Sequence, residues 1–247
     1  TIAHAAKDRS ERPPAAPQPA LGGTEQPGLF QEMLEGSLAG TQKIVFATRQ
    51  PAREWHFFAN TGYMCENPER EFFSAGGGGL YVLDLHSLET RTLLEDEGGA
   101  VRDPCLSYDA QKVLFSYRPA NEKVFHLYEI NIDGSGLTQL TDGLFDDIEP
   151  IYLPDGDIVF SSARARRYVP CMTSQVSLLY RCEPDGSNIR MLSNGQENEL
   201  TPWMLPDGRV IYMRWEYVER DVRTFHHLWT FNPDGTSEMV YFGNNAE

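Results

Sequence analysis

The sequence is poor in the residues that mark several common classes of protein. Only four cysteines occur in 247 residues, and none forms a C-x-x-C pair or a C-x-x-C-H haem-attachment motif. No apolar run reaches the ~18 residues that a membrane-spanning helix needs, and no G-x-S-x-G segment marks a serine hydrolase. Basic residues are also scarce, with 21 Lys and Arg against 36 Asp and Glu. The net charge of −15 repels phosphate backbones and argues against nucleic-acid binding.

The first part of the chain is rich in proline and alanine. Residues 1–28 read TIAHAAKDRSERPPAAPQPALGGTEQPG and show no apolar periodicity. Such a composition buries too little apolar surface to fold and is typical of a linker or a disordered tail. Residues 29–40 favour one short helix. We therefore assign residues 1–41 to a disordered Pro/Ala-rich tail or linker, and residues 42–247 to the globular part.

The globular part repeats itself. Segments that open with Leu-Tyr or Leu-Trp recur about every 50 residues, as repeat architectures require, and they start at Leu80, Leu127, Leu179 and Leu228. A second type of segment interleaves with the first: DPCLSYDAQKVLFSYR from Asp103, EPIYLPDGDIVFSSAR from Glu149 and TPWMLPDGRVIYMRWE from Thr201. Repetition at this period indicates one structural unit used several times.

Each repeat contains four short β-rich runs, and several of these are joined by Asp-Gly turns. Asp-Gly between two such runs is a strong hairpin signal, because glycine tolerates the positive φ that the turn demands. Four antiparallel strands in about 45–50 residues form one blade of a β-propeller. We predict an all-β chain of four four-stranded antiparallel blades, with the second strands at residues 43–49, 112–117, 157–162 and 209–214. The first blade lacks its inner strand, so we expect the chain to be part of a longer propeller.

The repeated phrase x-P-x-x-L-P-D-G-x-[VI]-x-[FY], followed by L-[YW]-x-x-x-x-D-G, resembles the TolB-like, WD-type propeller repeat over residues 42–244. Longer phrases at residues 144–171, 179–193 and 214–244 are similar to the propeller middle domain of the hydrazine synthase α-subunit and its planctomycete-type homologues. The resemblance implies a periplasmic or otherwise exported protein, although no signal segment is visible. Members of that family carry a c-type haem domain after the propeller. Its motifs are missing here, so hydrazine synthesis is not carried over.

Strand alternation places the long loops on one face of the predicted propeller. The loops between second and third strands are long, and insertions on one face usually mark the binding face; they span residues 50–79, 118–124, 163–176 and 215–225. The loops that precede the inner strands lie on the same face and carry many Asp and Glu residues. We expect acidic and basic side chains to meet at this mouth, where they either bind a ligand or simply solvate the loops and pair between blades.

Six residues near this mouth form the predicted site. The ligand or partner face consists of Glu149, Tyr168, Arg214, Glu216 and His227, with Cys171 as a candidate metal ligand. Three arginines precede Cys171 and would favour its thiolate, which is a ligand for zinc; a buried, inert cysteine is the alternative. His226 and His227 are adjacent in a predicted strand and point to opposite faces, so they do not form a two-histidine metal ligand.

These features leave three functions open. The first is a non-catalytic scaffold that binds a partner protein, or its own C-terminal haem-type domain, through the loop face. The second is one wall of a c-type haem or metal site that further C-terminal sequence completes. The third is a propeller lyase acting on acidic sugars, for which six scattered histidines are a poor basis. Zinc, and haem in an adjoining domain, are the cofactors that these functions would involve; we assign no catalytic residue.

Overall fold

The computed structural model describes residues 28–49, 76–170, 175–217 and 226–243. The chain divides into two compact units, Thr1–Gln42 and Lys43–Glu247. In the first unit, helix α1 (Leu29–Glu35) forms where the short helix is predicted, and none of its residues is buried. The prediction of a disordered tail falls on residues outside the described part and stays a prediction.

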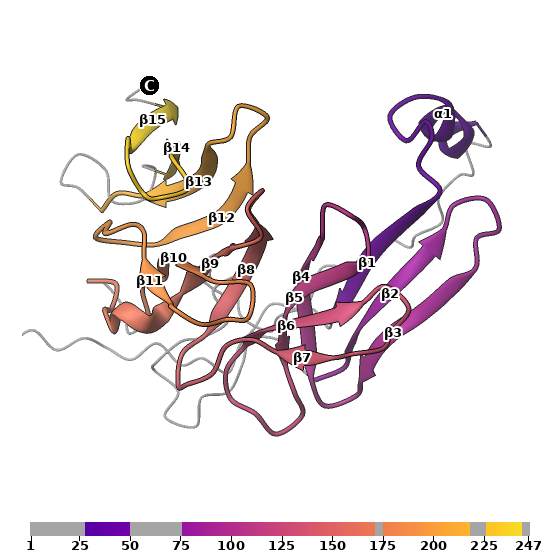
Figure 1. Ribbon diagram of the computed structural model, residues 1–247, viewed down its shortest axis with the longest axis horizontal. Coiled ribbons are helices and arrows are strands. Elements are labelled where there is room, and N and C mark those ends of the chain that lie inside the picture. Colours follow the sequence, from indigo (N-terminus) through magenta and orange to yellow (C-terminus); the bar gives the residue numbers. More distant parts are fainter. Residues whose placement is uncertain (1–27, 50–75, 171–174, 218–225, 244–247) are drawn as a thin grey trace, which may run out of the picture. The chain divides into compact units, whose positions relative to one another are not determined.

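The second unit consists of four antiparallel sheets, each built from strands that follow one another in the chain (Figure 1). The strands are β1 (Lys43–Arg49), β2 (Gly78–Asp84) and β3 (Thr90–Asp96) in the first sheet; β4 (Ala100–Leu106), β5 (Lys112–Arg118), β6 (His126–Asn131) and β7 (Thr138–Gln139) in the second; β8 (Asp147–Tyr152), β9 (Ile158–Ser162), β10 (Leu178–Cys182) and β11 (Arg190–Met191) in the third; and β12 (Glu199–Met204), β13 (Val210–Trp215), β14 (His226–Phe231) and β15 (Met239–Phe242) in the fourth. The four predicted blades are confirmed. Within the described residues, the first blade has three strands and lacks the inner one, as predicted. No helix in the described ranges is long and apolar enough to cross a membrane.

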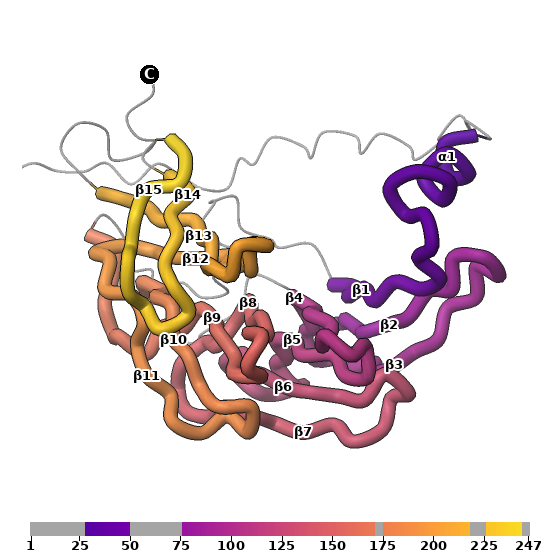
Figure 2. Tube along the Cα trace, turned by 45° about the horizontal axis from the view of Figure 1, so that its top comes forward, coloured from indigo at the N-terminus to yellow at the C-terminus, as the bar shows by residue number. Residues whose placement is uncertain are grey.

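The inner strands of successive blades lie next to one another. Strand β8 contacts both β4 and β12, while β4 also contacts β1, so the blades follow each other in chain order (Figure 2). Each blade turns a sheet face toward the next one. Strands β4, β8 and β12 therefore bring equivalent positions of three blades close together.

The hydrophobic core lies between the blades. Leu80 of the first blade packs with Phe115 of the second, Leu114 packs with Phe160 of the third, and Val159 packs in one cluster with residues of the fourth blade. The middle blades are covered on both faces, so all five residues of β9 are buried. Strand β1, in the first blade, has no fully buried residue.

The Asp-Gly turns take the conformation that their sequence predicts. The glycines of the five Asp-Gly turns that join neighbouring strands have φ between +84° and +93°, a region that favours glycine, and they are Gly134, Gly156, Gly186, Gly208 and Gly235. The preceding aspartates also tighten the turns, as Asp133 Oδ1 does by accepting the backbone N–H of Ser135 at 2.9 Å. These turns stand at the ends of the blades opposite to the described loops at residues 118–124 and 163–170.

Candidate functional site

Each complete blade carries the same irregularity in its inner strand, where a residue precedes proline. Asp103, Glu149 and Thr201 all have left-handed backbone, with φ of +56°, +55° and +52°. The pairing register with the second strand shifts at each of them, as at a β-bulge. A left-handed non-glycine residue costs on the order of 1–3 kcal/mol, so the surrounding structure must hold it in place.

Hydrogen bonds between blades stabilise these bulges. The backbone N–H of Glu149 donates to Asp103 Oδ2 at 3.1 Å, and that of Thr201 donates to Glu149 Oε2 at 2.6 Å. A serine of the second strand joins each carboxylate: Ser116 lies 3.2 Å from Asp103 Oδ2, and Ser161 lies 3.2 Å from Glu149 Oε2. We call these two carboxylate–amide contacts the inter-blade latch, because each carboxylate binds the inner strand of the following blade.

Arg102 supports both carboxylates of the latch. Its side chain is buried, with Nε 2.6 Å from Asp103 Oδ2 and Nη2 3.4 Å from Glu149 Oε1. Burial raises the pKa of the Glu149 carboxyl above its ordinary value, and the attraction of Arg102 opposes that shift. Two carboxylates and one guanidinium thus meet here, which leaves one net negative charge if both acids are ionised.

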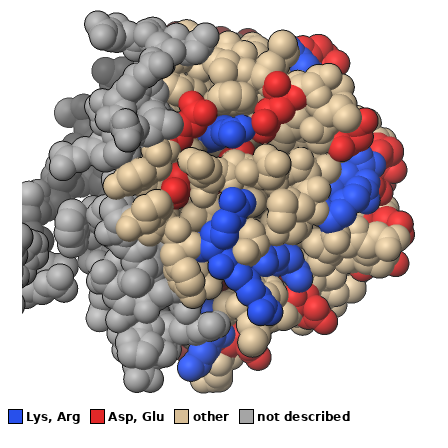
Figure 3. All heavy atoms as spheres, turned by 90° about the vertical axis from the view of Figure 1, so that its left-hand side faces the viewer, with Lys and Arg blue, Asp and Glu red and all other residues tan. Residues whose placement is uncertain are grey.

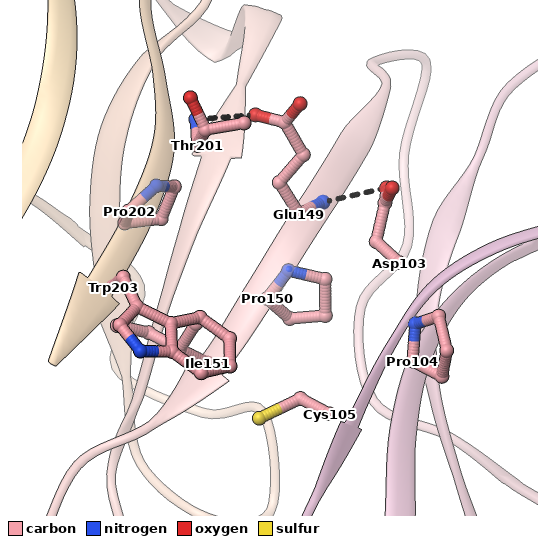
Figure 4. Close-up of a pocket in the computed structure, with 9 residues that line it drawn as sticks. All are labelled: Asp103, Pro104, Cys105, Glu149, Pro150, Ile151, Thr201, Pro202 and Trp203. Atoms are coloured by element: carbon pink, nitrogen blue, oxygen red, sulfur yellow. Dashed lines mark hydrogen bonds between the residues drawn. The ribbon is translucent and has the colours of Figure 1, made fainter. Parts of the chain in front are cut away.

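A cavity of about 190 Å³ opens beside the latch, where the three inner strands meet. Three equivalent tripeptides line this inner-strand cavity: Asp103-Pro104-Cys105, Glu149-Pro150-Ile151 and Thr201-Pro202-Trp203. Figure 4 shows the prolines between the two carboxylates on one side and Trp203, Ile151 and Cys105 on the other. The walls are thus largely apolar, with acidic groups along one border.

On the loop face, two loops of the third blade are fixed to each other. Arg164, in the short 3-10 helix η2 (Ala163–Ala165), donates to the carbonyl of Asp142 at 2.8 Å. The guanidinium groups of Arg164 and Arg166 lie 5.6 and 5.1 Å from the centre of the Phe145 ring. Leu144 and Tyr168 stay 69 % and 57 % exposed beside these contacts. We call Leu144, Phe145, Arg164, Arg166 and Tyr168 the loop patch.

The sequence predicts that acidic residues at the mouth either bind a ligand or solvate the loops and pair between blades. Most of them are buried, and Glu149 pairs with Arg102 of the preceding blade. Asp147 and Glu199 lie inside β8 and β12 and are inaccessible to solvent. Asp147 accepts hydrogen bonds from Ser162 at 2.6 Å and from Arg164 at 2.7 Å. The inner strands begin earlier than the sequence pattern suggested, which converts loop carboxylates into strand residues covered by the next blade. Glu149, predicted at the end of a loop, is likewise the third residue of β8.

Asp146 and Asn198 occupy equivalent positions immediately before β8 and β12. Asp146 Oδ1 accepts the backbone N–H of Phe125 at 2.9 Å, and Asn198 Oδ1 accepts that of Ser177 at 2.8 Å. Burial raises the pKa of the Asp146 carboxyl to about 7. Burial also raises the pKa of the Glu197 carboxyl to about 7. The fold therefore holds a carboxylic acid where the fourth blade uses a neutral amide.

This equivalence predicts how stability depends on pH. Because the pKa of Asp146 is about 7 in the folded chain and about 4 in the unfolded one, the folded state binds more protons between these values. The stabilising contribution of Asp146 is complete below about pH 4 and is lost as the pH rises through 7. We expect Asp146→Asn to make the free energy of unfolding less dependent on pH between 5 and 8, as measured by urea denaturation. Asp185→Asn, at an exposed turn, is the control that should leave this slope unchanged; an unchanged slope in Asp146→Asn would contradict the prediction.

The structure places five of the six predicted site residues. Arg214 and His227 are register partners on β13 and β14, and Arg214 also pairs across the sheet with Glu199 of β12. Arg214 Nη1 lies 2.9 Å from Glu238 Oε1. The carbonyl of Glu199 lies 3.5 Å from the Ser161 hydroxyl, which also contacts Glu149 Oε2. A chain of contacts thus joins Glu149 to Arg214 and His227.

Within the described part of the protein, Tyr168 and Glu216 do not take part in this series of contacts. Tyr168 forms an isolated bridge with Gln175, and Glu216 follows the end of β13. Cys171 lies outside the described residues, so its assignment as a zinc ligand stays a prediction. In the ranges that the structure describes, no three His, Cys, Asp or Glu side chains are grouped to hold a metal ion.

Sequence reasoning missed the inner-strand cavity. In the sequence, Pro104, Pro150 and Pro202 indicate the repeat. Each of them is preceded by an acid or a threonine at the same position of the repeat. That recurrence was the available signal. It could not reveal a cavity, because the cavity depends on the left-handed bulge and on contacts between blades.

Comparison with known proteins finds relatives that match part of the sequence. No protein-family profile matches the chain. Hydrazine synthase subunit alpha of Kuenenia stuttgartiensis is 35 % identical over 82 residues, which are 33 % of this chain and 10 % of that protein. An uncharacterized protein of Agrobacterium fabrum is 29 % identical over 114 residues, which are 46 % of this chain and 34 % of the relative. The chain thus matches only a tenth to a third of these relatives.

Solved structures show the same fold. Kuenenia stuttgartiensis hydrazine synthase superimposes with a TM-score of 0.66 at 19 % identity, covering 82 % of this chain and 32 % of that one. A putative TolB from Agrobacterium tumefaciens gives 0.53 at 21 % identity, covering 67 % and 56 %. An oligogalacturonate lyase in complex with manganese gives 0.50 at 17 % identity, covering 81 % and 50 %. The chain therefore carries a β-propeller fold that is similar to the propellers of hydrazine synthase and of TolB proteins.

Proposed function

We propose that this chain is a non-catalytic propeller module that binds a partner protein or domain through its long-loop face. The loop patch carries the proposal. Its two loops are fixed by the contacts of Arg164 with Asp142 and of Arg166 with Phe145, so Leu144 and Tyr168 are exposed on an ordered support. Exposed tyrosine and arginine on such a support are typical of interface hot spots, and the fixed conformation lowers the entropy cost of binding.

Charge suggests the chemistry of the partner. The whole chain has a net charge of −15, yet the loop patch contains two arginines and no acid, although Arg164 is paired with the buried Asp147 below it. Figure 3 shows a group of basic side chains on one face of the molecule, with acidic side chains around it. A partner segment with carboxylates and an apolar side chain would complement the patch. The sequence relative in hydrazine synthase is named as a subunit, which supports a protein partner, and the TolB-like fold supports a periplasmic location.

Site-specific photo-crosslinking in the native cells tests this proposal. A photoreactive amino acid at position 144 or 168 is expected to give the same discrete covalent adduct, because both side chains flank one patch. Arg166→Glu should lower the yield about tenfold, since it places repulsion where a charge-assisted contact is expected. The adduct is measured by gel mobility and identified by mass spectrometry.

Tyr108 supplies the matched control. It is 69 % exposed and lies between β4 and β5, at the opposite end of the blades from the loop patch. The photoreactive residue at 108 should give no such adduct. The proposal fails if positions 144 and 168 give none, or if position 108 gives the same adduct at the same yield.

A further inference from the structure

The inner-strand cavity combines acidic and aromatic groups in a space of small-molecule size. We propose that it binds an organic cation, namely an ammonium group carried on a short apolar body. This inference is independent of the loop patch, which lies at the ends of the blades, whereas the cavity lies where β4, β8 and β12 meet. The argument depends on charge, on the aromatic wall and on size.

The charge around the cavity favours a cation. Among the described residues, its lining includes Asp103 and Glu149 and no basic residue. Arg102 contacts both carboxylates from outside the lining, so two acids share one guanidinium. The contacts of Asp103 with Arg102, Ser116 and Glu149 all involve Oδ2, and its side chain is 24 % exposed. Within the described residues, Asp103 Oδ1 thus remains able to accept a hydrogen bond from an ammonium group.

Trp203 supplies an aromatic face for the same ligand. It is 61 % exposed, and among the described residues no ring or cation contacts its indole. The indole of Trp229, in contrast, is covered by the guanidinium of Arg214 at 4.5 Å. With the ammonium group at Asp103, the apolar body of the ligand can therefore stack on Trp203, and aromatic stacking of this kind is worth on the order of 0.5–1.5 kcal/mol.

Size and rigidity limit the ligand. A cavity of about 150 Å³ accommodates one benzene ring, so the ~190 Å³ here suits one ring, or a butyl chain, with an ammonium group. Pro104, Pro150 and Pro202 have fixed φ angles, and the inter-blade latch holds the acids that precede them. These walls are ordered before the ligand arrives, which reduces the entropy that binding costs.

Calorimetric titration of the full chain with phenethylammonium tests the proposal against 2-phenylethanol, its neutral counterpart, at pH 7 and low salt. We expect the cation to bind at least about tenfold more tightly, as one charge-assisted hydrogen bond implies. Trp203→Leu should weaken the cation about tenfold. Asp103→Asn should reduce the preference for the cation over the alcohol. Tyr241→Leu, which changes an exposed aromatic residue of β15, is the control that should change neither affinity.

A further ligand distinguishes a free amine from a protein side chain. Lysine blocked at both α groups presents its ammonium as a protein does, and its affinity relative to phenethylammonium shows which source the cavity prefers. Thermal melting confirms that each variant is folded; if Asp103→Asn is not, the salt dependence of cation binding to the unmodified chain replaces it. Equal affinity for cation and alcohol, or unchanged affinity in Trp203→Leu, would overturn the proposal.

Discussion

Glu149→Ala is expected to lower the free energy of unfolding by about 3–5 kcal/mol, the usual effect of removing one partner of a buried charged network. The substitution removes the acceptor of the Thr201 amide at 2.6 Å and of the Ser161 hydroxyl at 3.2 Å. It also takes from the buried Arg102 one of its two carboxylates. The left-handed bulge at residue 149 would then keep its conformational cost without the contacts that offset it. Urea denaturation followed by circular dichroism measures the change.

Glu149→Gln separates the hydrogen bond from the charge. The amide oxygen can still accept the Thr201 N–H, while the attraction to Arg102 is lost. We expect this variant to fall between the unmodified chain and Glu149→Ala. A loss below about 1 kcal/mol in Glu149→Ala would show that the latch contributes no more than an exposed ion pair does.

Phe160→Ala should have an effect of similar size, about 3–5 kcal/mol, as expected for emptying the volume of a phenylalanine in a packed core. Phe160 is inaccessible to solvent and lies in the cluster between the second and third blades. Its ring centre lies 6.2 Å from that of Tyr180. The two sheets cannot close the space, because their spacing is also fixed by the inner strands. Thermal and urea unfolding both report the loss.

Phe242→Ala is the matched control, because Phe242 is 72 % exposed on the outer strand β15. We expect its stability to stay within about 0.5 kcal/mol of the unmodified chain. Comparable losses in the two variants would mean that the region between the blades is not the main hydrophobic core.

Local chemistry made much of the fold predictable. Asp-Gly pairs such as Asp155-Gly156 mark tight turns because glycine alone readily takes their positive φ, and the structure shows those turns. The second strands β1, β5, β9 and β13 start within one residue of the predicted positions. The apolar runs of β5 and β9 are continuous because neighbouring blades cover both of their faces, and a buried strand is recognisable from such a run.

The candidate site was less predictable because it depends on contacts between blades. The sequence pattern brought Glu149 and Tyr168 to one mouth, but it did not show that Asp147 would be buried against Arg164. The left-handed backbone of Asp103, which precedes a proline, could not be predicted either, because residue preferences disfavour that conformation. The acid at this position is explained by its contacts with Arg102, with Ser116 and with the amide of the following blade, 46 residues further along the chain.

The inter-blade latch has a direction, and this limits how blades can be exchanged. Each acid accepts from the blade that follows it, so Asp103 with Ser116 and Glu149 with Ser161 act as equivalent connectors. In the fourth blade, Thr201 and Met213 occupy those two positions. A duplicate of the second or third blade could be inserted into the series with its connector intact, as neighbour-only coupling in repeat proteins allows. A duplicate of the fourth blade at the same place would interrupt the series, because it presents no carboxylate to its successor.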